Sequence, residues 1–235
     1  MKIVLLICAP FLLFANVHYA KVEPYESAVL KSAVSALVIG VDLDAEGKVV
    51  DKKRVIYLDD RLDKLNLKAS QENFLILGET LKRQEAYFGR INELNTASKA
   101  QKDTAFYNFA SAKTQYVDMG YKIAQLKDSI EKKSIVLHHQ YVYEIMVREG
   151  DFVSPGTPLA KVVDTDRAKL VLFLEPSEIE GIEKKAVYLG DKKTQYKVDK
   201  VWKVADEKFI SSYRAEIYID APEMSFSKLL KVELK

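Results

Sequence analysis

The sequence contains very little cysteine. Cys8 is the only cysteine among 235 residues, and it lies in the apolar run near the start of the chain. A mature chain without this run would contain no cysteine. That excludes disulfide bonds, a thiolate nucleophile and a cysteine-based metal site, and it suits an oxidising compartment.

Proline is absent between Pro24 and Pro155. A proline inside a helix removes a hydrogen bond and clashes with the preceding turn, so proline-free stretches permit long helices. The central part of this chain can therefore form helices that are not interrupted.

A strong charge of either sign is also absent. The formal net charge is only +2, and lysine and glutamate are interspersed throughout the chain. Without a basic block we expect no nucleic-acid partner, and there is no acidic tail.

Groups of residues that perform chemistry are scarce as well. His138 and His139 are adjacent, and we place them on a strand, where neighbouring side chains point to opposite faces. They therefore do not suit one metal ion. No Ser/His/Asp set and no glycine-rich phosphate loop can be assembled, so we expect neither an enzyme nor a bound cofactor.

The longest apolar run of the chain lies within its first twenty residues. Residues 1–20 contain one lysine, an apolar stretch over 3–14 and a small residue at Ala20. This pattern predicts a secretory signal peptide with cleavage near Ala20–Lys21. An uncleaved anchor is the alternative, although the run is short for a membrane span of about 20 residues.

Two long helices are predicted over 60–94 and 99–133. Their apolar residues recur at spacings of three and four, which indicates one seam along each helix. The seam positions are Leu67, Ser70, Phe74, Leu77, Leu81, Gln84, Phe88 and Ile91 in the first helix, and Ala105, Phe109, Ala112, Tyr116, Met119, Ile123, Leu126 and Ile130 in the second.

The turn between these helices is short. Ser98 and Gln101 form a capping box, which marks the start of the second helix. Two helices of equal length joined by about four residues must fold back as an antiparallel hairpin. At ~1.5 Å per residue each arm is about 50 Å long.

β-structure is predicted on both sides of the hairpin. Residues 142–159 alternate short apolar segments with turns at Gly150 and Gly156, and a weaker copy covers 41–58. Each copy is about half of a small β-sandwich. Residues 165–235 then contain five short segments typical of strands, which we interpret as a small β-barrel with Trp202 in its core.

This order of elements resembles the periplasmic adaptors, or HlyD-type membrane fusion proteins. The most specific piece is the segment 150–159, Gly-Asp-Phe-Val-Ser-Pro-Gly-Thr-Pro-Leu, which looks like the second half of the lipoyl-like domain of that family. The first half departs from the pattern, because Lys53 stands where a glycine is usual and Asp44-Ala45 add one residue.

The resemblance implies an elongated α+β chain, in which a coiled-coil hairpin is inserted into a split lipoyl-like sandwich that is followed by a β-barrel. The predicted parts are a signal peptide (1–20), N-terminal strands with the first half-sandwich (21–59), the hairpin (60–133), the second half-sandwich (134–164) and the barrel (165–235).

The resemblance also implies a function. Members of this family link an inner-membrane transporter, ABC-type or proton-driven, to a TolC-like outer-membrane channel for efflux or secretion, and they assemble as homo-oligomeric rings. The chain would be periplasmic and associated with the inner membrane. Arg90, Leu94 and Ser98 match the residue types at the family's channel-binding hairpin tip.

Two of the three tip residues can be explained without a partner protein. Arg90 can belong to a solvated helix face, and Ser98 can serve only as a helix cap. An apolar residue such as Leu94 at an exposed tip has no core to enter, which indicates a partner surface.

Two other functions remain open. One is a structural coiled-coil scaffold of the cell envelope without a transport role. The other is a carrier subunit of an enzyme, which we disfavour because the hairpin replaces the turn that holds the modified lysine in such carriers.

Overall fold

The computed structural model describes residues 17–220 and 226–235. Residues 1–16, most of the predicted signal peptide, lie outside this part. The chain divides into two compact units, one with residues up to Ala28 together with Val163–Lys235, the other with Val29–Val162. The chain therefore passes from one unit to the other twice.

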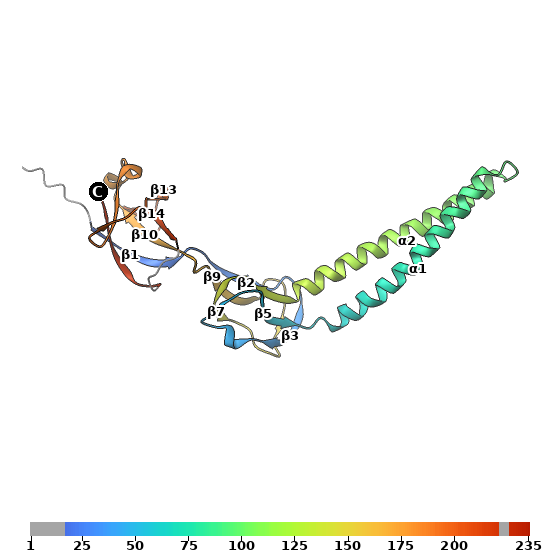
Figure 1. The fold of residues 1–235 in the computed structure, drawn as a ribbon, viewed down its shortest axis with the longest axis horizontal. Helices are drawn as coiled ribbons and strands as arrows, with labels where there is room; N and C mark the ends of the chain where they lie inside the picture. Colours follow the sequence, from blue (N-terminus) through green and yellow to red (C-terminus); the bar gives the residue numbers. More distant parts are fainter. Residues whose placement is uncertain (1–16, 221–225) are drawn as a thin grey trace, which may run out of the picture. The chain divides into compact units, whose positions relative to one another are not determined.

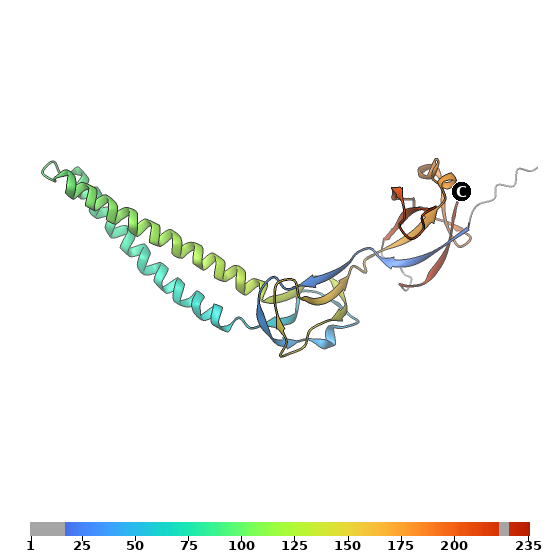
Figure 2. The same cartoon turned by 180° about the vertical axis from the view of Figure 1, so that it is seen from behind.

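Two helices dominate the unit of residues 29–162. α1 spans Arg61–Glu93 and α2 spans Lys99–Lys132, with 33 and 34 residues. Figures 1 and 2 show them side by side, antiparallel and joined by a short turn. The predicted hairpin is therefore confirmed, and its length is close to the expected ~50 Å per arm.

The predicted seam is the contact surface between the two helices. All sixteen seam positions are buried or half-buried, and Ala105 and Ala112 are the buried alanines of α2. Aromatic pairs hold the seam: Phe74 stacks on Tyr116 with ring centroids 4.3 Å apart, and Phe88 lies parallel to Phe109 at 5.7 Å. Such pairs stabilise beyond the area that they bury.

Two glycines permit this stacking. A Cβ on Gly78 would lie 3.3 Å from Cε2 of Tyr116, and one on Gly120 would lie 3.4 Å from Cε2 of Phe74. The aromatic rings can therefore approach the helix backbone closely. Gly89, in contrast, has nothing within 4 Å of the position where its Cβ would be.

This difference predicts opposite outcomes for one substitution. Gly89→Ala should raise the free energy of unfolding by about 0.5–1 kcal/mol, because alanine favours a helix interior over glycine. Gly78→Ala should give less than half of that gain, since its methyl group must displace the Tyr116 ring. Urea denaturation followed by helical circular dichroism measures both. Equal gains would contradict the close packing described here.

Two four-stranded sheets complete this unit. The first has the order β2-β9-β7-β4 and the second β6-β5-β3-β8. Their strands are β2 (Ser27–Lys31), β3 (Ala36–Val41), β4 (Val49–Val50), β5 (Lys53–Leu58), β6 (Ser134–Leu137), β7 (Gln140–Ile145), β8 (Phe152–Val153) and β9 (Pro158–Val163).

Each of these sheets combines strands from both sides of the hairpin. β2, β3, β4 and β5 precede α1 and the other four follow α2, and each sheet takes two from each group. The two β-segments therefore do not fold separately. They form one β-domain that the hairpin interrupts in sequence.

The segment over 142–159 lies in this domain as the turn pattern predicted. Val142, Ile145 and Val153 are buried, and Gly150 and Gly156 have φ of +94° and +93°, which favours glycine. Phe152 is an exception because 69% of its surface is exposed.

In the first half, the extra residue at Asp44-Ala45 is accommodated by a short 3₁₀ helix, Leu43–Ala45. Lys53, which stands where a glycine is usual, does not have a positive φ. The neighbouring residue Lys52 does, with φ of +49°.

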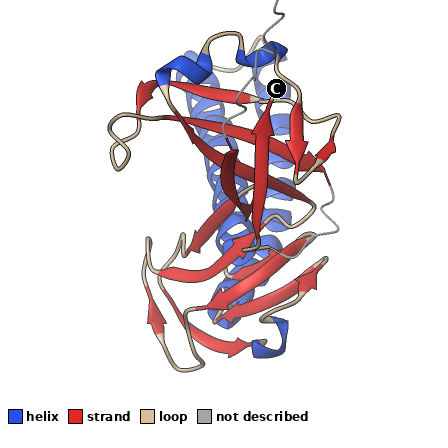
Figure 3. Cartoon of the chain, turned by 90° about the vertical axis from the view of Figure 1, so that its left-hand side faces the viewer, coloured by secondary structure: helices blue, strands red, loops and turns tan. Residues whose placement is uncertain are grey.

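The other unit contains a seven-stranded sheet of order β12-β11-β15-β1-β10-β14-β13 (Figure 3). The strands are β1 (Val17–Pro24), β10 (Arg167–Leu174), β11 (Val187–Leu189), β12 (Lys192–Lys193), β13 (Lys200–Ala205), β14 (Tyr213–Asp220) and β15 (Leu229–Leu234). A helical turn, α3 (Pro176–Ile179), and a 3₁₀ helix, Ile182–Lys184, follow β10. Because β12 and β13 are the outer strands of this order, closure into a barrel stays a prediction.

Three sequence-based expectations differ from the structure. β1 belongs to the sheet of the C-terminal unit, whereas the sequence pattern divides residues 17–24 between a signal peptide and the N-terminal strands that precede the first half-sandwich. His138 and His139 lie in the turn between β6 and β7 and not on a strand. Trp202 lies outside the buried cluster of its unit, next to Lys200 and Arg214, whereas its neighbour Val201 packs against that cluster.

Candidate functional site

The hairpin leaves the β-domain from two adjacent strands. β5 ends at Leu58, two residues before the Asp60 cap of α1, and β6 begins at Ser134, directly after Lys133 caps α2. β5 and β6 pair antiparallel, with Tyr57 opposite Ser134. The amide of Leu58 donates to the carbonyl of Lys133 at 3.0 Å. The two feet of the hairpin, which are the start of α1 and the end of α2, are therefore both fixed by one strand pair.

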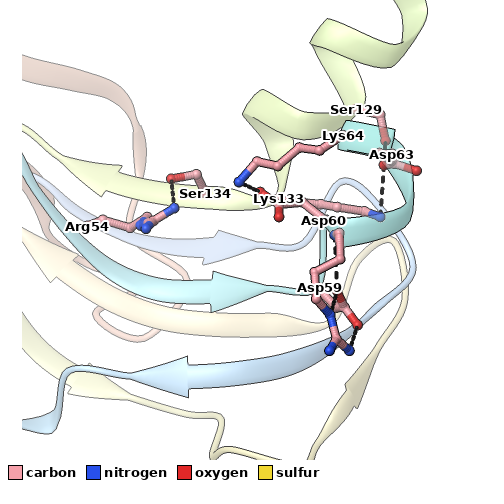
Figure 4. A network of polar contacts seen from close by, with 9 residues as sticks. Arg54, Asp59, Asp60, Asp63, Lys64, Ser129, Lys133 and Ser134 are labelled. Carbon is pink, nitrogen blue, oxygen red and sulfur yellow. Dashed lines mark hydrogen bonds and ion pairs between the residues drawn. The ribbon is translucent and has the colours of Figure 1, made fainter. Parts of the chain in front are cut away.

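A polar network reinforces these feet (Figure 4). Lys133 Nζ lies 2.9 Å from Asp63 Oδ2, and Ser129 Oγ donates to the same oxygen at 2.8 Å, so α1 and α2 are linked near their bases. The Lys64 ammonium lies 2.9 Å from the Asp60 carboxylate. These contacts orient the helices where they leave the sheet.

Asp59 holds the start of α1. Its carboxylate accepts two bonds from the Arg61 guanidinium, at 2.9 and 2.7 Å, and a third from the Arg61 amide at 3.1 Å. The Arg61 side chain, followed by its amide, lowers the pKa of Asp59 from 3.8 to about 2. The Lys133 ammonium lowers the pKa of Asp63 as well.

These lowered pKa values predict that the hairpin loses stability in acid. A carboxyl group with a folded pKa below its unfolded value stabilises the fold above the unfolded value and loses this effect as the pH falls. For Asp59 this window lies between about pH 4 and pH 2. We expect the thermal midpoint, followed by helical circular dichroism, to fall across it.

Asp59→Asn should reduce this fall, because the amide does not titrate. Glu79→Gln, on the exposed surface of the hairpin, is the matched control and should leave the fall as it is in the unmodified chain. Identical pH profiles for Asp59→Asn and the unmodified chain would contradict the assignment.

The hairpin tip contains the three residues that the sequence indicated. Arg90 is exposed in the last turn of α1, Leu94 is the C-cap of that helix with 48% of its surface exposed, and Ser98 is the N-cap of α2. The tip therefore brings them to the same end of the hairpin.

The capping box at the tip is confirmed. Ser98 Oγ accepts from the amide of Gln101 at 3.2 Å, and the Ser98 amide donates to Gln101 Oε1 at 2.8 Å. Lys102 Nζ adds a bond of 2.8 Å to the carbonyl of Asn92, which connects α2 to the end of α1. The turn that presents Leu94 is thus held from both helices.

Three exposed aromatic residues just below the tip, Tyr87, Phe106 and Tyr107, were not selected from the sequence. Phe88 contacts Phe106 at 5.7 Å between ring centroids, and Phe106 contacts Tyr107 at 5.9 Å. Phe106, Tyr107 and Tyr87 are 48%, 68% and 45% exposed. The sequence could have indicated them, because they are aromatic residues at positions outside the seam, and the 3.5-residue repeat leaves such positions facing solvent.

The C-terminal unit contains a second candidate surface. A hollow of about 390 Å³ is lined by apolar rings and by charged side chains, which are Tyr19, Lys21, Glu23, Val171, Phe173, Phe209, Arg214 and Leu229. Phe209 packs on Phe173 with ring centroids 4.3 Å apart. Tyr19 and Leu229 expose 70% and 64% of their surface there. Exposed apolar groups of this kind are typical of interaction surfaces.

Within the part of the chain that the structure describes, no three His, Cys, Asp or Glu side chains gather in a way that could hold a metal ion. Within the same residues, neither long helix is apolar enough to cross a membrane.

Solved structures similar to this chain include MacA and a membrane fusion protein. A chimera of MacA that contains the α-hairpin domain of Pseudomonas aeruginosa MexA matches 94% of this chain and 80% of its own, with a TM-score of 0.72 and 17% identity. MacA from Actinobacillus actinomycetemcomitans matches 94% of this chain and 78% of its own, with 0.72 and 14%. The membrane fusion protein Spr0693 from Streptococcus pneumoniae R6 matches 94% and 98%, with 0.68 and 8%.

This chain has the fold of MacA and of the membrane fusion protein Spr0693. The family resemblance inferred from the sequence is thereby confirmed. Because the sequence identities to these structures are below 20%, the similarity shows the fold alone. No family profile matches the chain. An uncharacterised protein of Haemophilus influenzae is 29% identical over 163 residues, which are 68% of this chain and 40% of that protein. The chain therefore matches less than half the length of that curated relative.

Proposed function

We propose that this protein is a periplasmic adaptor that links an inner-membrane transporter to a TolC-like outer-membrane channel, with the hairpin tip docking on the channel. The observation that carries the proposal is a two-helix rod whose feet are fixed to a β-domain and whose tip exposes Leu94. The adaptor fold supports the same role.

The β-domain acts in this proposal as a lipoyl-like clamp. Its two halves share both sheets, so the direction of the hairpin is set by strand pairing and by the polar network at its feet. A rod held in this way transmits position between its two ends. Its role is mechanical and not enzymatic.

The proposal includes assembly as a homo-oligomeric ring. Large apolar side chains outside the seam remain exposed on the hairpin, among them Leu75, Ile76, Tyr107, Val117 and Tyr121. Leu37, Ile39 and Phe152 form an exposed apolar patch on the β-domain, where Leu37 pairs with Phe152. Neighbouring copies would cover these groups. Sedimentation velocity that shows only monomer at all concentrations would argue against the ring.

The hollow of the C-terminal unit is the proposed contact for the inner-membrane transporter. It combines apolar rings with Lys21 and Arg214, a mixture typical of protein interfaces. If Tyr19→Ser left transporter binding unchanged in a pull-down assay, this surface would be excluded.

The length of the hairpin provides the test that separates an adaptor from a scaffold. Deleting residues 75–81 of α1 and 110–116 of α2 removes one heptad from each helix and keeps the seam in register. Each arm then becomes about 10 Å shorter. We expect this variant to fold but to fail to restore export in a strain that lacks the natural gene.

The matched control replaces the same fourteen residues by other heptads with the same seam residues, which keeps the length. We expect this control to restore export. If the shortened variant restored export to the same level, the hairpin would not act as a bridge of fixed length, and a structural scaffold would be favoured.

A further inference from the structure

The first strand of the C-terminal unit lies across the predicted signal cleavage site. β1 begins at Val17 and ends at Pro24, whereas the sequence pattern placed the cut between Ala20 and Lys21. A cut there would remove half of the strand. The pairing of β1 shows what the protein would lose.

β1 lies between two other strands and is hydrogen-bonded to both. Val17–Lys21 pair antiparallel with β15, and Val22–Pro24 pair with β10. In the order of the sheet, β1 therefore joins β12, β11 and β15 to β10, β14 and β13. The residues before Lys21 form most of the pairing with β15.

The side chains of these residues are also part of the fold. Ala20 is fully buried in the apolar cluster of the unit, together with Val22 and with Val232 of β15. His18 Nε2 lies 2.9 Å from Oε1 of Glu178, a buried carboxylate in α3. His18 and Ala20 lie two residues apart and therefore on the same face of β1, so the inward face of the strand is in use upstream of Lys21.

Cleavage after Ala20 would disrupt the middle of this sheet. Four of the five residue pairs between β1 and β15 would be lost, which leaves only Lys21 opposite Leu229 in that register. The new α-amino group would place a positive charge next to the buried Val22, where a charge is unfavourable. The site that the sequence pattern favours is therefore incompatible with the folded unit.

We infer that the mature protein keeps all of β1, so that its N-terminus lies at or before Val17. Ala15 offers a small residue directly after the apolar run that ends at Phe14, and cleavage between Ala15 and Asn16 leaves the strand whole. A retained N-terminal anchor also leaves it whole. The inference rests on the exported state in the proposed function, but on none of the proposed partners.

The direct test is the N-terminal residue of the exported protein. The complete chain with a C-terminal affinity tag is produced in a bacterium with a periplasm, recovered from the envelope fraction, and analysed by Edman sequencing and intact mass. We expect Asn16, or Met1 if the anchor is retained. A folded protein that begins at His18, Tyr19, Ala20 or Lys21 would overturn the inference.

A second measurement examines the strand itself. Two chains, one starting at Val17 and one at Lys21, are compared by limited proteolysis with the fragments mapped by mass spectrometry. We expect cleavage within residues 163–235 to be at least tenfold faster for the chain that starts at Lys21, with residues 29–162 equally resistant in both. Equal rates within 163–235 would overturn the inference.

The control is Val17→Ser in the longer chain. Val17 is 44% exposed, so this variant removes apolar surface at the start of β1 while the strand stays complete. We expect its proteolysis to match that of the unmodified longer chain. Fractionation of the cells reports separately whether the chain is exported, so a failure of the proposed function is distinguishable from a failure of this inference.

Discussion

Replacing Leu94 by aspartate is expected to weaken binding of the hairpin tip to a TolC-like channel at least tenfold, while the fold stays intact. Leu94 is 48% exposed, so the substitution disturbs little internal packing. In a complex the new carboxylate would be buried in an apolar contact without a partner, which is costly. A tenfold loss is equivalent to about 1.4 kcal/mol, a modest value for a central interface residue.

The matched control for this experiment is Leu62→Asp at the base of the same helix. Leu62 is 68% exposed in the first turn of α1, where a negative charge is favourable. Biolayer interferometry with the purified channel should give the unmodified affinity for this control. Equal affinities for Leu94→Asp and Leu62→Asp would exclude Leu94 from the docking surface.

Leu58→Ala is expected to lower the free energy of unfolding of the unit of residues 29–162 by about 2–4 kcal/mol. Leu58 is only 2% exposed and is the last residue of β5, directly before the hairpin. Its truncation would leave a cavity where the strand pair holds both feet, and buried leucine-to-alanine changes cost this much. Urea denaturation followed by circular dichroism measures the loss.

Val136→Ala is the control on the neighbouring strand β6. Val136 is 39% exposed, so we expect its truncation to cost less than about 0.5 kcal/mol. If Leu58→Ala cost no more than Val136→Ala, the packing at the hairpin base would not stabilise the unit.

The hairpin could be predicted almost completely from the sequence, because helices are determined by local patterns. The spacing of the seam residues gave both helices, and the Ser98–Gln101 capping box gave the start of α2. The absence of proline permitted uninterrupted helices. In the structure, α1 ends one residue before the predicted boundary at Leu94 and α2 begins at the predicted Lys99.

The place of β1 could not be predicted in the same way. Strand pairing depends on residues far apart in sequence, and the partners of β1 lie near residues 170 and 230. Val17–Ala20 also lie within the predicted signal peptide, residues 1–20, so their composition fits a targeting segment as well as a buried strand. Pairing in the folded unit separates these two interpretations.

Trp202 shows a second feature that could not be predicted from the sequence, namely which face of a strand is buried. Residues on a strand alternate between the two faces, so a shift of one residue exchanges the buried and the exposed set. The sequence predicts Trp202 in the core, whereas Val201 packs there and Trp202 lies near the cations of Lys200 and Arg214. At the tip, Arg90, Leu94 and Ser98 lie where the resemblance placed them, and their contact role stays a prediction.

The most direct test of the central proposal is photo-cross-linking at the tip in living cells. A photoreactive amino acid is introduced at position 94 and, separately, at position 62, and the adducts are identified by mass spectrometry. We predict an adduct with an outer-membrane channel of the TolC type from position 94 and none from position 62. A protein that restores export but gives no channel adduct from position 94 would contradict docking through the tip.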